Sequence, residues 1–269
     1  MTQSSSSQRW ALILGASSGF GAATALELAR HGYHIAGVHL DRKATLVNVE
    51  QLVTAIKAAG RTALFFNVNA ADPEKRKEVL DQLEPAVKAG SPPGQVFVLM
   101  HSLAFGSLRP FIANDPKTVV SKDQMDMTLD VMANALVYWT QDLFFRKLLG
   151  AGSHVLSMTS SGGTRVWHNY GPVSAAKAAL ESHTRQLALE CAPHGIAVNC
   201  IRAGVTDTPA LRKIPGSEQM IEFAKVRNPH HRLTTTDDVA RAIASLVSSP
   251  SSWITGNIIG VDGGEDVVG

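Results

Sequence analysis

The stretch that decides the fold reads Gly15-Ala16-Ser17-Ser18-Gly19-Phe20-Gly21. An apolar run, Trp10–Leu14, precedes it, and a helical pattern follows it. In such a stretch the first glycine permits a tight turn, the second lets the backbone approach an anion, and the third lets the helix pack closely on the strand. Free N–H groups and the positive end of the helix dipole favour a phosphate group there, and two serines add hydroxyl donors. The stretch predicts a phosphate-binding turn between a strand and a helix.

Outward from this turn, short apolar runs alternate with longer helical patterns. We expect strands at Trp10–Leu14, Ile35–Val38, Thr62–Phe66, Val96–Leu99, His154–Met158, Ala197–Ile201 and Ile258–Val261. We expect helices at Gly21–Arg30, Leu46–Ala59, Pro73–Lys88, Lys122–Leu149, Val173–Cys191 and Thr236–Val247. Near-continuously apolar strands are typical of sheets that are covered on both faces. The pattern predicts an α/β fold with a Rossmann-type, doubly wound parallel sheet of about seven strands.

The chain shows no internal repeat and no interior linker. We expect residues 10–269 to form one catalytic domain that binds a dinucleotide, and residues 1–9, which are polar and Ser-rich, to form a disordered tail. Residues 209–232 form the one irregular excursion, which contains three prolines and follows the sixth strand. Long excursions from a compact domain are usually lids or binding loops, so this segment is predicted to be a substrate-binding lid.

Composition excludes several other classes of protein. Of 269 residues, 45% are hydrophobic and 18% charged, which is enough apolar content for a large core. A formal charge of +2 lacks the basic excess of a dedicated nucleic-acid binder. Two cysteines form neither a disulfide framework nor a four-cysteine zinc site, and the adjacent His230 and His231 lack metal-ligand spacing. The tail has no apolar signal-peptide core, and no run is long enough to span a membrane, so we expect a cytoplasmic protein.

From about Arg9 to Gly264 the sequence resembles the short-chain dehydrogenase/reductase family. The glycines of the first turn match its Gly-x-x-x-Gly-x-Gly motif, and Ser160 and Lys177 match its catalytic Ser and Lys, seventeen positions apart. The family's usual Tyr position, four before the Lys, holds Val173, and the nearest upstream tyrosine is Tyr170. The resemblance implies a Rossmann-type NAD(P)-dependent oxidoreductase whose catalytic residues are Ser160, Tyr170, Lys177 and Asn134.

The departures from the common pattern resemble the enoyl-acyl-carrier-protein reductase branch. His101-Ser102-Leu103-Ala104-Phe105 is similar to its type I members. Three other places resemble the type III, FabL-like members of the branch. They are Gly106-x-Leu108-Arg109-Pro110, Ser160-Ser161, and Asp207-Thr208 with Ala210-Leu211. The resemblance implies reduction of the C=C bond of a 2-enoyl thioester. Two alternatives remain open: a carbonyl or 3-ketoacyl reductase (or the reverse alcohol dehydrogenase) on the same scaffold, and a catalytically silent NADP-binding regulator.

The chemistry requires a hydrogen-bond donor for the negative charge that gathers on the thioester oxygen. Tyr170 is the candidate, and Pro172 in the first helical turn suggests that this tyrosine lies just outside the helix, facing a cleft. Lys177 then lies about 9–10 Å further along the axis, so we expect it to hold the nicotinamide ribose and to act on the phenol through the field. Ser160 either assists or lines the site. Asn134 is expected to support a proton-relay water, although a helix-kink role is the alternative.

The cofactor is expected to be NADP(H) rather than NAD(H). The family's usual Asp position after the second strand holds His39, and Arg42 and Lys43 follow, although Asp41 lies close by. The predicted cofactor-binding residues are Gly15, Ser17, Ser18, Gly19, Phe20, Gly21, His39, Arg42, Asn69, His101, Ser102, Lys177, Gly204, Val205 and Thr208. The substrate is expected to be a small or carrier-bound acyl group.

The resemblance also implies a homotetramer formed through Lys122–Leu149 and Val173–Cys191. An acyl carrier protein would need a basic rim. The candidates for this rim are Arg109, Arg165, Arg212, Lys213, Lys225 and Arg227.

Overall fold

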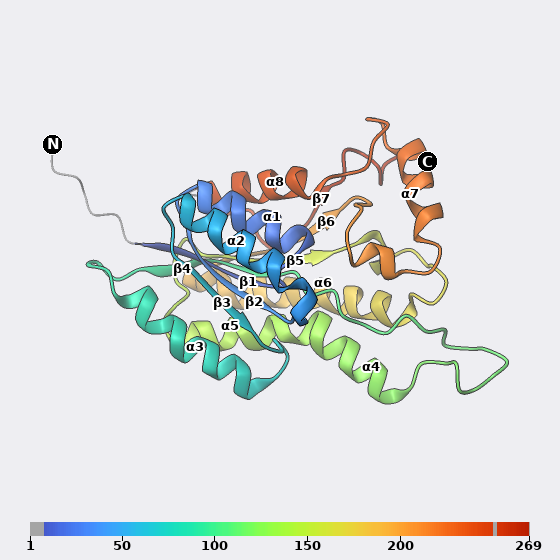
Figure 1. Cartoon of the computed structure of the whole chain (residues 1–269), viewed down its shortest axis with the longest axis horizontal. Coiled ribbons are helices and arrows are strands. Elements are labelled where there is room, and N and C mark those ends of the chain that lie inside the picture. The colour runs from blue at the N-terminus through green and yellow to red at the C-terminus, as the bar shows by residue number, and fades with distance from the viewer. Residues whose placement is uncertain (1–7, 250–251, 269) are drawn as a thin grey trace.

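A twisted parallel sheet forms the middle layer of the protein (Figure 1). The computed structural model describes residues 8–249 and 252–268. Within them the sheet has the strand order β3-β2-β1-β4-β5-β6-β7, and every neighbouring pair is parallel. The strands are β1 Arg9–Leu14, β2 His34–His39, β3 Ala63–Asn67, β4 Gln95–His101, β5 His154–Thr159, β6 Ala197–Ala203 and β7 Ile258–Val261. The predicted doubly wound sheet of seven strands is confirmed.

Helices cover both faces of the sheet because each face carries apolar side chains (Figure 1). One face packs against α1 Gly19–Arg30, α2 Leu46–Ala58 and α8 Thr236–Ser248. The other packs against α3 Pro73–Lys88, α5 Ala135–Phe145 and α6 Gly171–Cys191. Leu12 and Leu14 point into the second core and Ile13 into the first, as the alternation of side chains along a strand requires. No helix within residues 8–249 and 252–268 is long and apolar enough to cross a bilayer.

The helix expected at Lys122–Leu149 is interrupted and ends earlier. It consists of α4 Lys122–Leu129, a π-helical turn at Asp130–Asn134, and α5, which ends at Phe145. A capping box between Ser121 and Gln124 starts α4. The chain leaves α5 through Lys147 with φ of 59°, which helical backbone does not adopt. A π turn inserts one extra residue into a helix and is frequent at functional sites.

Several other boundaries differ from the predictions by one or two residues; for example, α1 begins at Gly19 rather than at Gly21. Arg9 belongs to β1 rather than to the tail, and residues 1–7 lie outside the described residues. Helix α6 begins at Gly171, two residues before the expected Val173. The segment 209–232 is not irregular throughout, because it contains a short 3₁₀ turn, Leu211–Lys213, and the helix α7, Ser217–Arg227. Its proline and glycine residues suggested a loop, but they stand outside α7.

The indole of Trp139 fixes the loop after β3 to α5. Its N–H donates to the carbonyl of Ala70 at 2.8 Å, and both residues are buried. We expect Trp139→Phe to lower the free energy of unfolding by about 1–3 kcal/mol, because a buried carbonyl loses its donor. Urea unfolding measures this loss. The control is Tyr138→Phe, at a neighbouring side chain that is 38% exposed. Equal stability of the two variants would contradict this role of the indole.

Candidate active site

The sheet reverses its strand order between β1 and β4, and the chain approaches itself closely there. The N–H of Ser102, just after β4, donates to the carbonyl of Leu14 at 2.8 Å. A Cβ atom on Gly15 would lie 2.4 Å from the carbonyl oxygen of Ser102, so no larger residue fits at position 15. Ligands of open parallel sheets bind in the crevice outside the carboxyl ends of the strands at this switch point. The structure therefore brings two predicted cofactor residues, Gly15 and Ser102, to the same crevice.

The first turn forms a cradle that suits a dinucleotide pyrophosphate. A Cβ atom on Gly21 would lie 2.0 Å from the carbonyl oxygen of Gly15, so the turn closes only with glycine there. Gly19 has φ of 54°, in the left-handed region that favours glycine. Ser18 is the N-cap of α1, and within the described residues its side chain forms no cap hydrogen bond. The first N–H groups of α1 are thus left to bind an anion.

Asp41 reaches the same turn from the end of β2. Its carboxylate accepts hydrogen bonds from Thr45 Oγ1 at 2.6 Å and from His39 Nδ1 at 2.9 Å. Partial burial alone raises the pKa of Asp41, but hydrogen bonds from Thr45, Ser17 and His39 outweigh it and hold the pKa below its usual value. Asn67 fixes the backbone by bonding both the N–H and the carbonyl of Asp41, at 2.9 and 3.0 Å. From the sequence, Asp41 is only a near neighbour of the predicted cofactor residues His39 and Arg42.

Three other predicted cofactor-binding residues lie at or just after the ends of β2 and β3. Arg42 and Asn69 are exposed, and the amide oxygen of Asn69 accepts the N–H of Ala71 at 3.1 Å. His39 is buried, with Nδ1 turned to Asp41. These positions border the crevice without contacting the reactive residues described next.

The loop between β5 and α6 brings two hydroxyl groups together. Tyr170 is the N-cap residue of α6 and so lies just outside the helix, as expected. A Cβ atom on Gly162 would lie 2.4 Å from the Tyr170 ring, which packs against this glycine. Ser160 Oγ accepts the N–H of Gly162 at 3.2 Å and also interacts with the phenol. Burial raises the pKa of Tyr170, and the hydrogen bond with Ser160 opposes that rise. The phenol is therefore a protonated donor at neutral pH.

Lys177 lies buried on α6, below the same loop. Its Nζ donates to the carbonyl of Met158, in β5, at 2.7 Å. Burial lowers the pKa of Lys177 to about 8, while electrostatic interactions with Cys200 and Glu181 oppose the decrease. An ammonium in so little solvent projects its charge further than one at the surface. The predicted bond from Lys177 to a nicotinamide ribose stays a prediction.

His101 bonds the π turn from β4, and Asn134 is the last residue of that turn. His101, the last residue of β4, is fully buried, and its Nε2–H donates to the carbonyl of Val131 at 3.1 Å. Burial and then the charge of Lys177 lower the pKa of His101 to about 3, so its ring is neutral, as a structural histidine requires. The amide oxygen of Asn134 accepts from Nε2 of His183, on α6, at 3.0 Å. Its expected role in holding a relay water stays a prediction.

The loop after β6 faces the first turn across the crevice. A Cβ atom on Gly19 would lie 3.7 Å from the methyl group of Thr208, which is buried. The N–H of Val205 donates to Glu265 Oε2 at 3.1 Å, and the N–H of Gly204 donates to the carbonyl of Val261 at 3.2 Å. Three predicted cofactor residues, Gly204, Val205 and Thr208, therefore lie on a loop that is fixed from the C-terminal segment.

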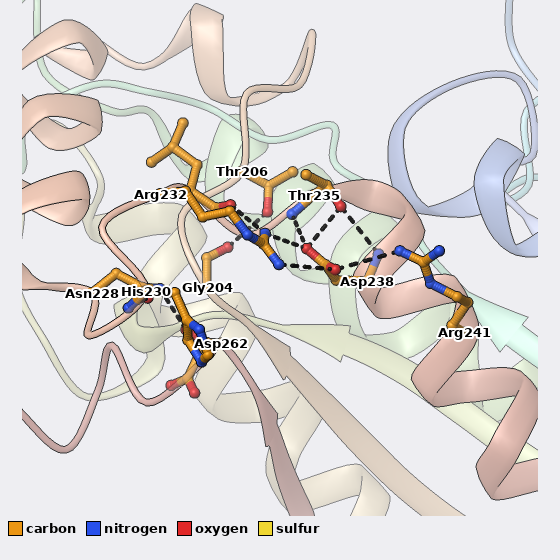
Figure 2. A network of polar contacts seen from close by, with 10 residues as sticks. Gly204, Thr206, Asn228, His230, Arg232, Thr235, Asp238, Arg241 and Asp262 are labelled. Atoms are coloured by element: carbon orange, nitrogen blue, oxygen red, sulfur yellow. Dashed lines mark hydrogen bonds and ion pairs between the residues drawn. The ribbon is translucent and has the colours of Figure 1, made fainter.

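A polar network supports this loop from the side of α8 (Figure 2). Arg232 and Asp238 form an ion pair at 2.6 Å, and Thr235 caps α8 by accepting the N–H of Asp238. The hydrogen bond from Arg232 to Asp238 is the main reason why the pKa of this carboxyl lies far below its usual value. Beside the network is a cavity of 160 Å³, whose lining includes Asn228 and Thr234.

The segment 209–232 contacts the loop that carries the hydroxyl groups. Trp167 Nε1 donates to the carbonyl of Pro215 at 3.0 Å, and its ring lies over Gly216. Phe111 packs on Gly171, beside Tyr170.

The cations predicted as a basic rim are largely engaged within the chain. Their ion pairs join Arg165 to Asp266, Arg212 to Asp207 and Lys225 to Glu222.

Comparison with known proteins identifies the family. A family model described as enoyl-(acyl carrier protein) reductase matches residues 15–265. The chain belongs to the short-chain dehydrogenase/reductase family. An enoyl-[acyl-carrier-protein] reductase [NADH], FabI, of Synechocystis sp. is 32% identical over 176 residues, which cover 65% of this chain and 67% of that protein. A 1-cyclohexenylcarbonyl-CoA reductase of Streptomyces collinus is 26% identical over 268 residues, covering 99% and 90% of the two chains.

A short-chain dehydrogenase from Burkholderia cenocepacia J2315, solved in complex with NADP, superposes with a TM-score of 0.80. The two chains are 28% identical over 97% of this protein and 99% of that one. This short-chain dehydrogenase/reductase is thus an NAD(P)-dependent oxidoreductase that resembles the enoyl-acyl-carrier-protein reductase branch. The activity and the fold predicted from the sequence are confirmed at this level.

Sequence reasoning missed the acidic residues of the site. Glu265 bonds Val205, 60 positions earlier, and Asp266 pairs with Arg165, 101 positions earlier. Glu181 accepts from Thr159 Oγ1 at 2.7 Å and lies against Gly163. None of these contacts follows a helical or strand spacing, so no local pattern signals them.

The buried Lys177 gives the fold a distinctive pH dependence. Because the folded pKa of Lys177, about 8, lies below the ordinary lysine value of 10.5, the unfolded chain binds more protons between these pH values. Folding stability should therefore rise with pH there, by on the order of 3 kcal/mol in total. We expect wild type to gain this much relative to Lys177→Met between pH 8 and 10.5, measured by urea unfolding. Lys43→Met, at an exposed position, is the control. A pH-independent difference would contradict a desolvated ammonium.

Proposed function

We propose that the protein reduces the C=C bond of a 2-enoyl thioester, with NADPH as the hydride donor. The observation that carries the proposal is the phenol of Tyr170, which is partly buried, has a raised pKa and lies against Ser160. Hydride addition to the β-carbon leaves negative charge on the thioester oxygen, and a protonated phenol is the donor that this charge needs. The enoyl reductases among the relatives support the same reaction.

The cradle at Gly15, Gly19 and Gly21 fits a dinucleotide, which supplies the hydride when bound. In this proposal Tyr170 donates a hydrogen bond to the thioester oxygen. Ser160 orients the phenol and shares the negative charge. Lys177, whose ammonium donates to the carbonyl of Met158, would bond the ribose next to the nicotinamide. Asn134, whose amide oxygen accepts from His183, would support the water that returns a proton from solvent.

The raised pKa of Tyr170 fits a phenol that stabilises an enolate by a hydrogen bond. A ketoreductase must transfer a whole proton from the phenol to an alkoxide, and a nearby ammonium normally lowers the phenol pKa for this step. Here burial raises that pKa, and within the described residues Ser160 is the group that opposes the rise. Stabilising an enolate requires only a hydrogen bond, which a phenol of high pKa supplies.

The reaction is tested by following NADPH oxidation with crotonyl-CoA and with acetoacetyl-CoA. We expect turnover of crotonyl-CoA, and a loss of about 100-fold or more in kcat for Tyr170→Phe, because one preorganised donor to a developing oxyanion is removed. Tyr138→Phe, an exposed tyrosine on α5, is the control and should retain full activity.

Each contrary result has a distinct meaning. Reduction of acetoacetyl-CoA alone would make the protein a carbonyl or 3-ketoacyl reductase. Tight NADPH binding with no turnover of either substrate, unaffected by the tyrosine change, would make it a cofactor-binding regulator.

The proposed preference for NADPH rests on the end of β2. His39 replaces a carboxylate there, and the exposed cations Arg42 and Lys43 follow. The carboxylate of Asp41 is already bonded by Thr45 and His39, which leaves the cations to meet a 2′-phosphate. The NADP complex of the Burkholderia relative supports this choice, whereas the Synechocystis relative is named for NADH.

The preference is measured as the ratio of kcat/KM for NADPH and NADH. We expect NADPH to be favoured, and Arg42→Ala to raise its KM by about tenfold or more while leaving the KM for NADH unchanged, since only NADPH carries the phosphate. Lys57→Ala, an exposed cation at the far end of α2, is the control. Equal use of both cofactors, unchanged by Arg42→Ala, would remove the preference.

The proposal extends to assembly and substrate. We propose a homotetramer that pairs the faces of α4, α5 and α6, on which Phe145 and Leu189 are 76% and 70% exposed. Apolar side chains around Tyr170, including Phe111 and Trp167, suit the chain of an acyl substrate.

A further inference from the structure

The C-terminal segment Val261–Val268 contacts three parts of the site at once. We call these residues the C-terminal clamp. A turn built on Asp262 shapes it, because its carboxylate accepts the N–H groups of Gly264 at 3.0 Å and Asp266 at 3.2 Å. These bonds bring the side chains of Glu265 and Asp266 back toward β6. Neither side chain belongs to the reactive group of Ser160, Tyr170 and Lys177.

The clamp fixes the loop after β6 through Glu265. Its Oε2 accepts the N–H of Val205, and a Cβ atom on Gly204 would lie 3.0 Å from the same oxygen. The clamp also fixes the base of the segment 209–232, since Asn228 Nδ2 donates to the carbonyl of Asp262 at 2.9 Å and Arg227 Nε to that of Val268 at 2.8 Å (Figure 2 shows the Asn228 contact).

The third contact reaches the loop between Ser160 and Tyr170. Asp266 Oδ1 pairs with Arg165 at 2.8 Å, and its Oδ2 pairs with Arg202, in β6, at 3.0 Å. The carboxylate is only 19% exposed and bridges two guanidinium groups, so it forms a network rather than an isolated surface pair. Through Asp266 the loop is tied to the sheet.

The first part of the loop is also held locally, because the N–H of Arg165 donates to the carbonyl of Ser161 and the Ser174 hydroxyl donates to that of Gly162, but the middle of the loop is not buried. Residues 164–168 are all exposed, and Val166 is 94% exposed, so burial does little to fix them. Trp167 binds the carbonyl of Pro215, but that partner belongs to the segment 209–232, which is itself held at its base by the clamp. The pairing of Arg165 with Asp266 is thus the direct link from this loop to the sheet among the described ion pairs.

We propose that Asp266 is a positioning residue. By holding Arg165 it sets the path of the loop that carries Ser160 and Tyr170, and so aims the phenol at the crevice. The inference rests on the proposed function only in taking this phenol as the reactive donor. Misplacing a reactive group by about 1 Å costs up to about 100-fold in rate, so a loop restraint has a catalytic effect without touching substrate.

The test is a double-mutant cycle with Asp266→Asn and Arg165→Gln, using whichever of crotonyl-CoA or acetoacetyl-CoA the wild type reduces. We expect each single change to lower kcat about tenfold, with KM for the cofactor within about twofold of wild type. The double variant should lose no more than Asp266→Asn alone, because both changes break the same link and Asp266→Asn also removes the pair with Arg202. Asp237→Asn, an exposed acid in the first turn of α8, is the matched control.

A second readout does not need turnover. Amide hydrogen exchange of residues 161–169 should become faster in Asp266→Asn and in Arg165→Gln, and not in Asp237→Asn, while NADPH affinity by fluorescence stays near wild type. Unchanged exchange in this loop would overturn the proposal even if the enzyme proved inactive on both substrates. Losses of kcat that multiply in the double variant, or a kcat equal to wild type, would also overturn it. Failure of the proposed function alone would appear as reduction of acetoacetyl-CoA but not of crotonyl-CoA, with the exchange and double-mutant results as expected.

Discussion

The close approach of the first turn to the backbone after β4 is the constraint on which the site depends. Gly15 has no room for a side chain because the carbonyl of Ser102 occupies that space, and Gly21 has none because of the carbonyl of Gly15. These two contacts set how deep the crevice is and where α1 begins. The loop after β6 then meets the turn at Thr208 and Gly19. The glycines therefore set the geometry of a cradle shared by three loops.

Burial of charge is the second theme of the site. Lys177 sits in the core with a lowered pKa, and its field helps to keep His101 neutral. Tyr170, which is partly buried, keeps its proton. Each shift arises mainly from lost solvent, which strengthens every remaining electrostatic interaction. Burying this ammonium costs the fold stability. In return, its charge acts strongly on neighbouring groups such as His101.

Much of this arrangement was predictable from the sequence, because it depends on local patterns. Apolar runs predicted the strands, and the glycine spacing predicted the first turn. Tyr170 was expected outside the helix on account of Pro172, and it is the N-cap residue. The helix α7 was missed because prolines and glycines around it suggest a loop. The bond of Asn67 to Asp41 and the ion pairs of Asp266 were missed because these partners lie on other strands and loops, and only the folded chain brings them together.

The wide turn at Asp130–Asn134 has a consequence for the phase of the long helical segment. In regular α geometry each residue advances about 100° around the axis. An unbroken helix with the same sequence would therefore rotate every side chain of α5 relative to α4 by about that angle, and Trp139 would no longer face Ala70. Because the π turn contains one extra residue, the side chains of α4 and α5 face in directions that one regular helix would not allow. Helix α4 bonds the chain after β4, since Thr128 accepts the N–H of Ser107 at 2.9 Å, and α5 packs into the core.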